Sequence, residues 1–329
     1  MTVVLVGGLK CAQSLWCLQR GFERAGCDVA YVPSVTHKPR GGKMVRNDLY
    51  AALTSVGRHA DLVLWWQPQN GVSIEALDAL RGRVPLAMMS MDDPFVFETE
   101  YCANFSEFEL AVTCCDGATA WYQSRDIVPL VGYPPCDRDL HGAAVPDPDR
   151  ACDFLFAATN TYPGDRFTYA VDRCDIVRAV ADLGTVHLYG YWGVKARDWH
   201  RLGDRMKHLW KGWLGYEAHP GVMAAARINL NSHVRPDGYR YLNERVTLAM
   251  ASGGFHLCDR VSGIEELFDE GREIVLWDDL ADLADKACYY LAHDRARRNV
   301  AALGRRKALA MFDNERLARR ILEVTGARR

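Results

Sequence analysis

The sequence predicts an α/β protein built from two successive Rossmann-like domains. Short apolar runs rich in β-branched residues alternate with amphipathic helical stretches in both halves of the chain. The chain has 329 residues, which is long for one domain and comfortable for two. Between the halves, residues 134–150 (PPCDRDLHGAAVPDPDR) are rich in proline and aspartate and lack an apolar period, which is typical of a linker. We therefore expect domains at residues 1–140 and 141–312.

Composition excludes several classes of protein. Hydrophobic residues make up 49% and charged residues 25%, which is ordinary for a soluble globular chain. A net charge of -2 gives no overall case for a nucleic-acid or membrane partner. No apolar run is long enough to span a bilayer, and the first residues (MTVVLVGG) enter a strand without a basic leader, so we expect a cytoplasmic protein.

The cysteines indicate a reduced protein. The chain has 11 of them, an odd number, and they are scattered without a C-x-x-C pair. This pattern favours buried thiols over a disulfide framework. Because the spacing of zinc ligands is also missing, we expect no metal site.

The first half opens with a βαβ unit. A strand at residues 3–6 ends at Gly7-Gly8 and is followed by a helix at 12–25 and a strand at 29–32. The glycine turn lacks the full G-x-G-x-x-G pattern, so a tight strand-to-helix turn is at least as good an interpretation as a dinucleotide site. Residues 36–46 are basic, contain glycines and have no apolar period, which predicts an exposed loop. The alternative is a flexible basic segment that meets an anionic acceptor.

Two adjacent acids follow a buried strand in this half. The strand predicted at residues 84–91 runs into Asp92-Asp93-Pro94. Adjacent side chains on a strand point to opposite sides, so only one of the two carboxylates can easily face a binding site. Asx residues before proline are also plain turn formers, and the residues alone favour that interpretation.

The second half restarts with a strand at residues 152–158. The loop after it leads to a helix that begins near Arg166, and an arginine beside helix N–H groups suits an anion. A strand at 186–189 ends in Gly190-Tyr191-Trp192, where the aromatic pair would cover a nucleobase or pack an interface. Residues 195–211 predict an amphipathic helix with buried tryptophans, although glycan or nucleic-acid contact also suits basic residues interleaved with tryptophan.

The most informative stretch is residues 241–277. A helix at 242–251 ends in Ser252-Gly253-Gly254, a strand follows at 255–258, and Asp259 stands at its carboxyl end. A second turn opens a short helix at Gly263-Ile264-Glu265. Ligands of open α/β sheets bind outside the carboxyl ends of strands, so both turns are predicted ligand sites. Helices at 281–293, 295–312 and 314–324 complete the chain.

This stretch resembles the donor-binding half of GT-B glycosyltransferases of the group 1 type. The resemblance is carried by Arg245, Gly253-Gly254-Phe255, Asp259, Gly263, residues 265–268 and residues 271–274, and it is nearest to the spore-maturation (CgeB-like) group. Asp92-Asp93-Pro94 also matches that group. The resemblance implies two Rossmann-like domains facing a cleft, with a final helix at 313–329 that crosses back to the first domain. It also implies metal-independent transfer from a nucleotide-diphosphate sugar, with a UDP-sugar favoured and no other cofactor.

The resemblance assigns expected roles to individual residues. The candidates for the catalytic base are Asp92 or Asp93, with His37 as second choice, although a retaining mechanism needs no such base. The acceptor side is expected to involve Gly7, Gly8, Lys38, Arg40 and Lys43. The donor is expected to contact Arg166, Gly190, Tyr191, His233, Arg235, Arg245, Gly253, Gly254, Asp259, Gly263, Ile264 and Glu265.

Two positions depart from the pattern. Related enzymes carry a glutamate that contacts the nucleotide ribose where this chain has Leu248, and a first glutamate where it has Arg240. Glu244, Glu265 or Glu266 are the available substitutes. A non-catalytic nucleotide-sugar-binding or assembly protein, and a sugar epimerase of the same fold, therefore remain as alternatives. The acceptor stays open among a small molecule, a glycan and a hydroxymethylated DNA base of phage type, as does the oligomeric state.

Overall fold

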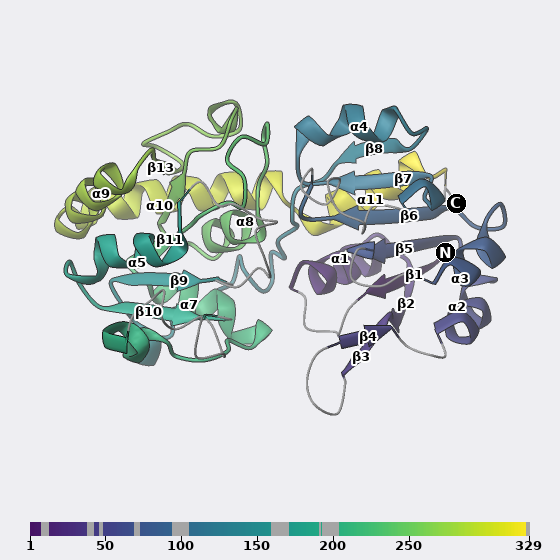
Figure 1. Cartoon of the computed structure of the whole chain (residues 1–329), viewed down its shortest axis with the longest axis horizontal. Helices are drawn as coiled ribbons and strands as arrows, with labels where there is room; N and C mark the ends of the chain where they lie inside the picture. The colour runs from purple at the N-terminus through teal and green to yellow at the C-terminus, as the bar shows by residue number, and fades with distance from the viewer. Residues whose placement is uncertain are drawn as a thin grey trace. The chain divides into compact units, whose positions relative to one another are not determined.

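The structure is a computed structural model that describes residues 1–7, 13–37, 43–45, 49–68, 73–93, 105–158, 171–190, 192 and 204–326. The chain divides into two compact units (Figure 1). The first unit comprises Met1–Asp137 and Phe312–Arg329, and the second comprises Arg138–Met311. The boundary between Asp137 and Arg138 falls inside the segment predicted as a linker.

The first unit is built on a parallel sheet of six strands in the order β2-β1-β5-β6-β7-β8. The strands are β1 (Thr2–Gly7), β2 (Asp28–Pro33), β5 (Leu62–Trp66), β6 (Leu86–Ser90), β7 (Leu110–Thr113) and β8 (Val128–Val131). The helices are α1 (Gln13–Arg24), α2 (Leu49–Gly57), α3 (Ile74–Leu80), α4 (Thr119–Gln123) and α11 (Asn314–Val324). Strands β5, β6 and β7 are buried at every position, as expected for a parallel sheet covered on both faces.

The last helix of the chain completes the core of the first unit. Leu317, Ala318 and Ile321 of α11 pack in one apolar cluster with Leu18 and Phe22 of α1. The two helices approach so closely that a Cβ at Gly21 would lie 2.2 Å from the backbone oxygen of Asn314. Only glycine fits such an approach, which explains a glycine within α1.

The buried carboxylate of Asp137 links these two helices by hydrogen bonds and ion pairs. Asp137 is fully buried and accepts hydrogen bonds from Arg20 Nε at 2.6 Å and Asn314 Nδ2 at 3.0 Å, with Arg24 Nη1 2.9 Å from the same oxygen. Asn314 Nδ2 also donates to the carbonyl of Cys17 in α1 at 2.8 Å. Burial alone would raise the pKa of Asp137, but the hydrogen bonds and charges of Arg24 and Arg20 lower it to about 2.

We expect the isosteric change Asp137→Asn to destabilise the chain by about 3 kcal/mol at pH 7, because it leaves two partly buried guanidinium groups without the buried carboxylate that they share. The folded pKa of about 2 lies below the ordinary 3.8, so the ionised carboxylate stabilises the fold above pH 4 and this contribution is lost as the pH falls to 2. Urea unfolding between pH 7 and pH 2.5 measures it. The difference from wild type should shrink on acidification, whereas the exposed control Asp126→Asn should show little difference at any pH. A constant difference would contradict the assignment.

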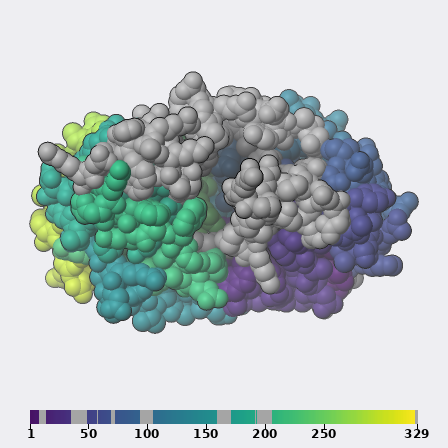
Figure 2. Space-filling model, turned by 60° about the horizontal axis from the view of Figure 1, so that its bottom comes forward, coloured from purple at the N-terminus to yellow at the C-terminus, as the bar shows by residue number. Residues whose placement is uncertain are grey.

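The second unit repeats the architecture with a parallel sheet of five strands in the order β10-β9-β11-β12-β13. The strands are β9 (Phe154–Ala157), β10 (Val186–Tyr189), β11 (Ile228–Leu230), β12 (His256–Asp259) and β13 (Val275–Trp277). The helices are α5 (Arg173–Ala181), α7 (His219–Ala225), α8 (Glu244–Ala251), α9 (Leu280–Ala292) and α10 (Asp294–Met311). Side chains of α5 and α9 pack against this sheet in one apolar cluster. Helices α9 and α10 form the yellow-green surface in Figure 2. The predicted class, two Rossmann-like β/α units, is confirmed.

Two local predictions were wrong. Residues 36–46 were predicted as a loop, but β3 (Val35–His37) and β4 (Lys43–Val45) pair as an antiparallel ribbon. The end of the helix predicted at 195–211 is instead a 3₁₀ helix, Asp204–Leu209, followed by a bridge between Trp210 and Leu188. Within the segment predicted as a linker, Cys136, Asp137 and His141 are buried.

The cysteines and helices of the described segments add two findings. Nine cysteines there are free thiols, eight of them buried, and Cys288 is exposed. Among the helices that the structure describes, none combines the length and the apolar character needed to cross a membrane.

Candidate functional site

The carboxyl ends of three neighbouring strands in the second unit surround a pocket. β11 leads into Asn231-Ser232-His233, β12 ends at Asp259, and β13 leads into Asp278. Because the strands are parallel and adjacent, these ends meet at one edge of the sheet, which is where α/β folds bind ligands. The pocket holds about 310 Å³ of empty space, a figure that includes some of the open solvent at its mouth. Its lining comprises Val171, Ser232, His233, Pro236, Asp259, Arg260, Trp277 and Asp278.

Asp259 holds His233 at the pocket. One carboxylate oxygen of Asp259 lies 2.8 Å from His233 Nδ1, and the other accepts the backbone N–H of His233 at 2.6 Å. Asn231 Nδ2 donates to the first oxygen at 3.0 Å. Burial alone would raise the pKa of Asp259, but His233 and Arg245 lower it to about 2, so the carboxylate is ionised. The loop after β11 is therefore attached to the end of β12.

Arg245, a predicted donor-binding residue, organises the same loop. Its Nε donates to Asn231 Oδ1 at 2.9 Å and its Nη2 donates to the carbonyl of Ser232 at 2.7 Å. Arg173, at the start of α5, donates to the same carbonyl at 3.1 Å. Asn243 caps α8 by accepting from the backbone N–H groups of Arg245 and Val246, which sets where Arg245 projects. Two guanidinium groups thus converge on one carbonyl beside the pocket.

Acidic residues around the pocket are largely occupied by arginines. Arg260 bonds Asp278 at 2.6 Å and Glu270 at 3.0 Å, and it also pairs with Glu265. These bonds, led by the one to Asp278, raise the pKa of Arg260 further above its ordinary value. Glu265, a predicted donor-binding residue, lies in this exposed cluster. Arg235, another, pairs with its neighbour Asp237 at 2.6 Å.

A second set of hydrogen bonds joins the loops after β11 and β12. Glu266 accepts hydrogen bonds from Tyr239 Oη at 2.8 Å and from Arg240, and the backbone N–H of Arg240 donates to the carbonyl of Ser262 at 2.7 Å. Gly263 has φ of 74°, and a Cβ there would lie 2.5 Å from the ring of Tyr239. Glycine at position 263 is required both by the backbone angle and by this packing.

The two departures from the glutamate pattern have distinct structural settings. Leu248 is 1% exposed within α8, so no carboxylate stands at this position. Arg240 is engaged with Glu266 across the two loops. Of the possible substitutes, Glu265 and Glu266 lie in ion pairs, and Glu244 is half-buried in the first turn of α8.

The two turns predicted as one ligand site lie at opposite edges of the sheet, and this expectation needs correction. Gly253 and Gly254 connect α8 to the start of β12, whereas Asp259 is the last residue of β12 and Gly263 follows it. A Cβ at Gly254 would lie 2.4 Å from Asn229 Nδ2 and 2.6 Å from the carbonyl of Met223, so close packing explains this glycine.

Other predicted donor-side residues are placed as follows. Gly190 directly follows β10 at the carboxyl edge and has φ of 98°, and Ile264 is fully buried. Arg166 and Tyr191 lie outside the described residues. Sequence analysis did not single out Asn231 or Trp277 as site residues. Alternation of polar and apolar residues along β11 was the only available signal for Asn231, and none pointed to Trp277.

One group of side chains has the spacing of metal ligands. The nearest ligand atoms of His233, Cys258 and Asp259 lie within 4.8 Å of one another in the described part of the chain. A metal requires the thiolate form of cysteine, and burial raises the pKa of Cys258 well above its ordinary value. His233 and Asp259 are hydrogen-bonded to each other, so we interpret these three residues as a hydrogen-bonded cluster and not as a metal site.

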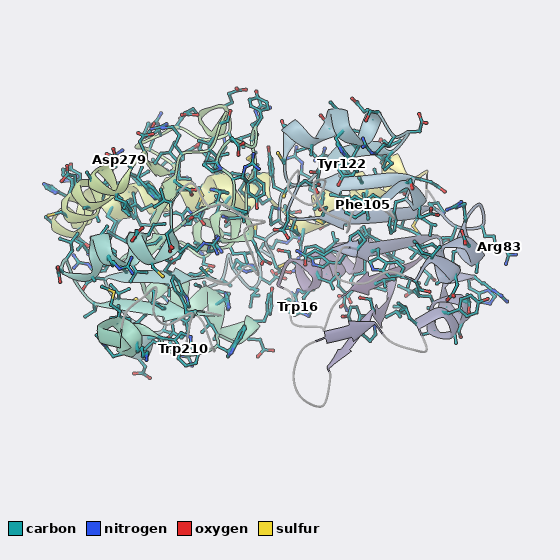
Figure 3. All side chains as sticks on the ribbon, in the orientation of Figure 1. Trp16, Arg83, Phe105, Tyr122, Trp210 and Asp279 are labelled. Atoms are coloured by element: carbon teal, nitrogen blue, oxygen red, sulfur yellow. The ribbon has the colours of Figure 1, made fainter. Side chains whose placement is uncertain are left out.

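In the first unit, the two predicted acids have different environments. Asp93 is fully buried and accepts hydrogen bonds from Ser90 Oγ at 2.5 Å and Tyr122 Oη at 2.8 Å. Burial raises its pKa to about 6. Tyr122 stacks on Phe105, and both are labelled in Figure 3. Asp92 is half-exposed, so it is the carboxylate of the pair that solvent reaches.

The predicted acceptor-side residues are only partly described. Gly7 is buried at the end of β1, where a Cβ would lie 2.8 Å from Leu15 Cδ2, so packing explains it. His37 and Lys43 lie on the paired strands β3 and β4, without described side chains. Gly8, Lys38 and Arg40 fall outside the described residues.

The raised pKa of Asp93 gives a pH-dependent prediction. Its folded pKa of about 6 exceeds the ordinary 3.8, so the ionised carboxylate opposes folding as the pH rises from 4 to 6. The variant Asp93→Asn should therefore gain up to about 3 kcal/mol of stability relative to wild type between pH 4 and pH 7. Urea unfolding at several pH values measures this difference, with the exposed Asp78→Asn as control. A difference that stays flat over this range would refute the buried, proton-binding carboxylate.

Comparison with known proteins shows which proteins share this architecture. The model of a family described as glycosyl transferase-like matches residues 173–323. A search of curated proteins gave no match. Among solved structures, Anabaena HepE in complex with UDP and glucose has a TM-score of 0.70 at 14% identity, with 100% of each chain covered. Sucrose-phosphate synthase from Thermosynechococcus elongatus has a TM-score of 0.65 at 13% identity, with 98% of each chain covered.

A DNA-modifying β-glucosyltransferase, solved in the presence and absence of uridine diphosphoglucose, is also similar. Its TM-score is 0.63 at 11% identity, with 99% of this chain and 100% of that chain covered. Together these structures establish that the protein has the GT-B fold of glycosyltransferases. The finer resemblance to the CgeB-like group remains a prediction.

Proposed function

We propose that the protein is a glycosyltransferase that moves a sugar from a UDP-sugar to a hydroxyl acceptor. The observation that carries this proposal is the family match over residues 173–323, which contains every residue lining the carboxyl-edge pocket except Val171. The second unit would bind the donor. The UDP moiety is favoured because HepE was solved with UDP and glucose and the β-glucosyltransferase with uridine diphosphoglucose.

The chemistry of the pocket edge supports this role. Departure of a diphosphate requires cationic groups and N–H donors where negative charge develops. Arg245 and Arg173 converge on the loop that borders the pocket, and Arg166 is the further predicted contact. In the first unit, Asp92 is the better candidate than Asp93 for a base that deprotonates an acceptor hydroxyl, because a base must reach the substrate. The acceptor remains a small molecule, a glycan or a hydroxymethylated DNA base.

Ligand binding tests the donor assignment. UDP and UDP-sugars should raise the melting temperature, because a ligand that binds only the folded chain stabilises it by about 2.7 kcal/mol at 100 times its dissociation constant. The shift should grow with the logarithm of ligand concentration. Adenosine, guanosine and thymidine diphosphate sugars serve as controls for base preference. No shift with any of these nucleotides would count decisively against a donor site.

A nucleotide-sugar-binding protein without turnover is the second candidate, and the buried Leu248 favours it because the position has no carboxylate. Release of free sugar from the donor that gives the largest thermal shift separates the two. A competent transferase should hydrolyse this donor slowly in the absence of acceptor, and Arg245→Met should reduce the rate at least tenfold. Binding without hydrolysis would favour the non-catalytic protein.

A further inference from the structure

Two buried ring nitrogens, on residues that line the same pocket, have no hydrogen-bond partner among the described residues. They are His233 Nε2 and Trp277 Nε1, and both residues line the pocket at the carboxyl edge. The His233 side chain is 0% exposed. Leaving a buried polar group unpaired costs about 1–3 kcal/mol, so two such groups beside one pocket point to a ligand that completes them.

The surrounding bonds fix which kind of partner His233 needs. Arg245 Nε donates to Asn231 Oδ1, which turns the Asn231 amide so that Nδ2 faces Asp259. Asp259 is an ionised acceptor, so the proton of His233 lies on Nδ1 and is donated to it at 2.8 Å. Where the imidazole is neutral with its proton on Nδ1, Nε2 is an acceptor.

The ring of His233 is also held in place by packing. Tyr241 meets it edge-to-face with centroids 5.3 Å apart. The backbone N–H of His233 donates to Asp259 at 2.6 Å. Neither the ring nor the backbone of His233 can therefore turn without breaking a hydrogen bond to Asp259. The acceptor lone pair of Nε2 therefore has a defined direction, as recognition of a specific group requires.

The pair of nitrogens selects the ligand chemistry. Trp277 Nε1 is a donor, and Nε2 of the neutral His233 ring is an acceptor, so a partner of both has to accept one hydrogen bond and donate another. Ionised phosphate oxygens carry no hydrogen for Nε2. Sugar hydroxyls can both donate and accept, and a ring with several of them can satisfy both nitrogens at once.

We propose that His233 Nε2 and Trp277 Nε1 bind hydroxyl groups of the sugar carried by the nucleotide donor, with Asp259 as the positioning residue that sets the His233 tautomer. This inference rests on the proposed function, since it assigns the sugar-recognising residues of the same site. It goes beyond that function by distinguishing the residues that bind the sugar from those that bind the nucleotide.

Calorimetric titration at pH 8 tests the assignment with two kinds of probe. Wild type, His233→Gln and Trp277→Phe are titrated with UDP and with UDP-glucose, UDP-galactose and UDP-N-acetylglucosamine. For the UDP-sugar that wild type binds most tightly, His233→Gln should weaken binding about tenfold and Trp277→Phe about threefold to tenfold, the loss expected for one hydrogen bond. Affinity for UDP should change less than twofold. His293→Gln, at the exposed carboxyl end of α9, is the matched control.

A spectroscopic measurement covers the case in which a variant fails to fold. In wild type labelled with nitrogen-15 at histidine, His233 should show a protonated Nδ1 and an unprotonated Nε2. The UDP-sugar, but not UDP, should shift the Nε2 resonance in the direction of an accepted hydrogen bond. A protonated Nε2 in the free protein, or no shift with the UDP-sugar, would overturn the proposal.

The outcomes separate the two levels of inference. If His233→Gln weakens UDP as much as the UDP-sugar, the contact is to the nucleotide and the sugar assignment is wrong. Unchanged affinities in both variants also refute it while leaving donor binding intact. If wild type binds neither UDP nor any of these UDP-sugars, the proposed function itself fails.

Discussion

The Asp259 carboxylate joins the elements on which the candidate site depends. It accepts a ring N–H, a backbone N–H and an amide N–H from the loop after β11, although Asp259 itself ends β12. A buried charge with several charge-assisted hydrogen bonds resists displacement, because releasing any partner leaves an unpaired group in a low-dielectric setting. The bonds from Arg245 to Asn231 and to the Ser232 carbonyl depend on the loop conformation that this carboxylate sets.

Much of the fold could be predicted from sequence because its signals are local. The strand predicted at residues 186–189 is β10, and the three predicted C-terminal helices begin and end within one residue of α9, α10 and α11. Helix α2 has no acidic residue in its first turn and was not predicted. The ribbon β3–β4 was mistaken for a loop because its residues lack a period, and pairing between strands is not visible in either strand alone.

The site was less predictable because its groups come together only in the folded chain. His233 and Asp259 were both candidates, but 26 residues separate the partners of their hydrogen bond. Gly253 and Gly254 looked equivalent to Gly263 in sequence, and only the direction of β12 shows that they lie at the other edge. The difference between Asp92 and Asp93 likewise depends on Tyr122 and Ser90, which bury one of two chemically identical groups.

The position of α11 has a consequence for synthesis of the chain. Leu317, Ala318 and Ile321 belong to the core of the first unit, and Asn314 contacts the buried Asp137 group. On the ribosome, the sheet of this unit emerges before the second unit but lacks part of its apolar cover until α11 has left the exit tunnel. The second unit, by contrast, is one continuous segment, Arg138–Met311, and can fold as soon as it is complete. The N-terminal half is therefore the later of the two to reach its native state, and a chain that stops before residue 312 would carry an exposed apolar face.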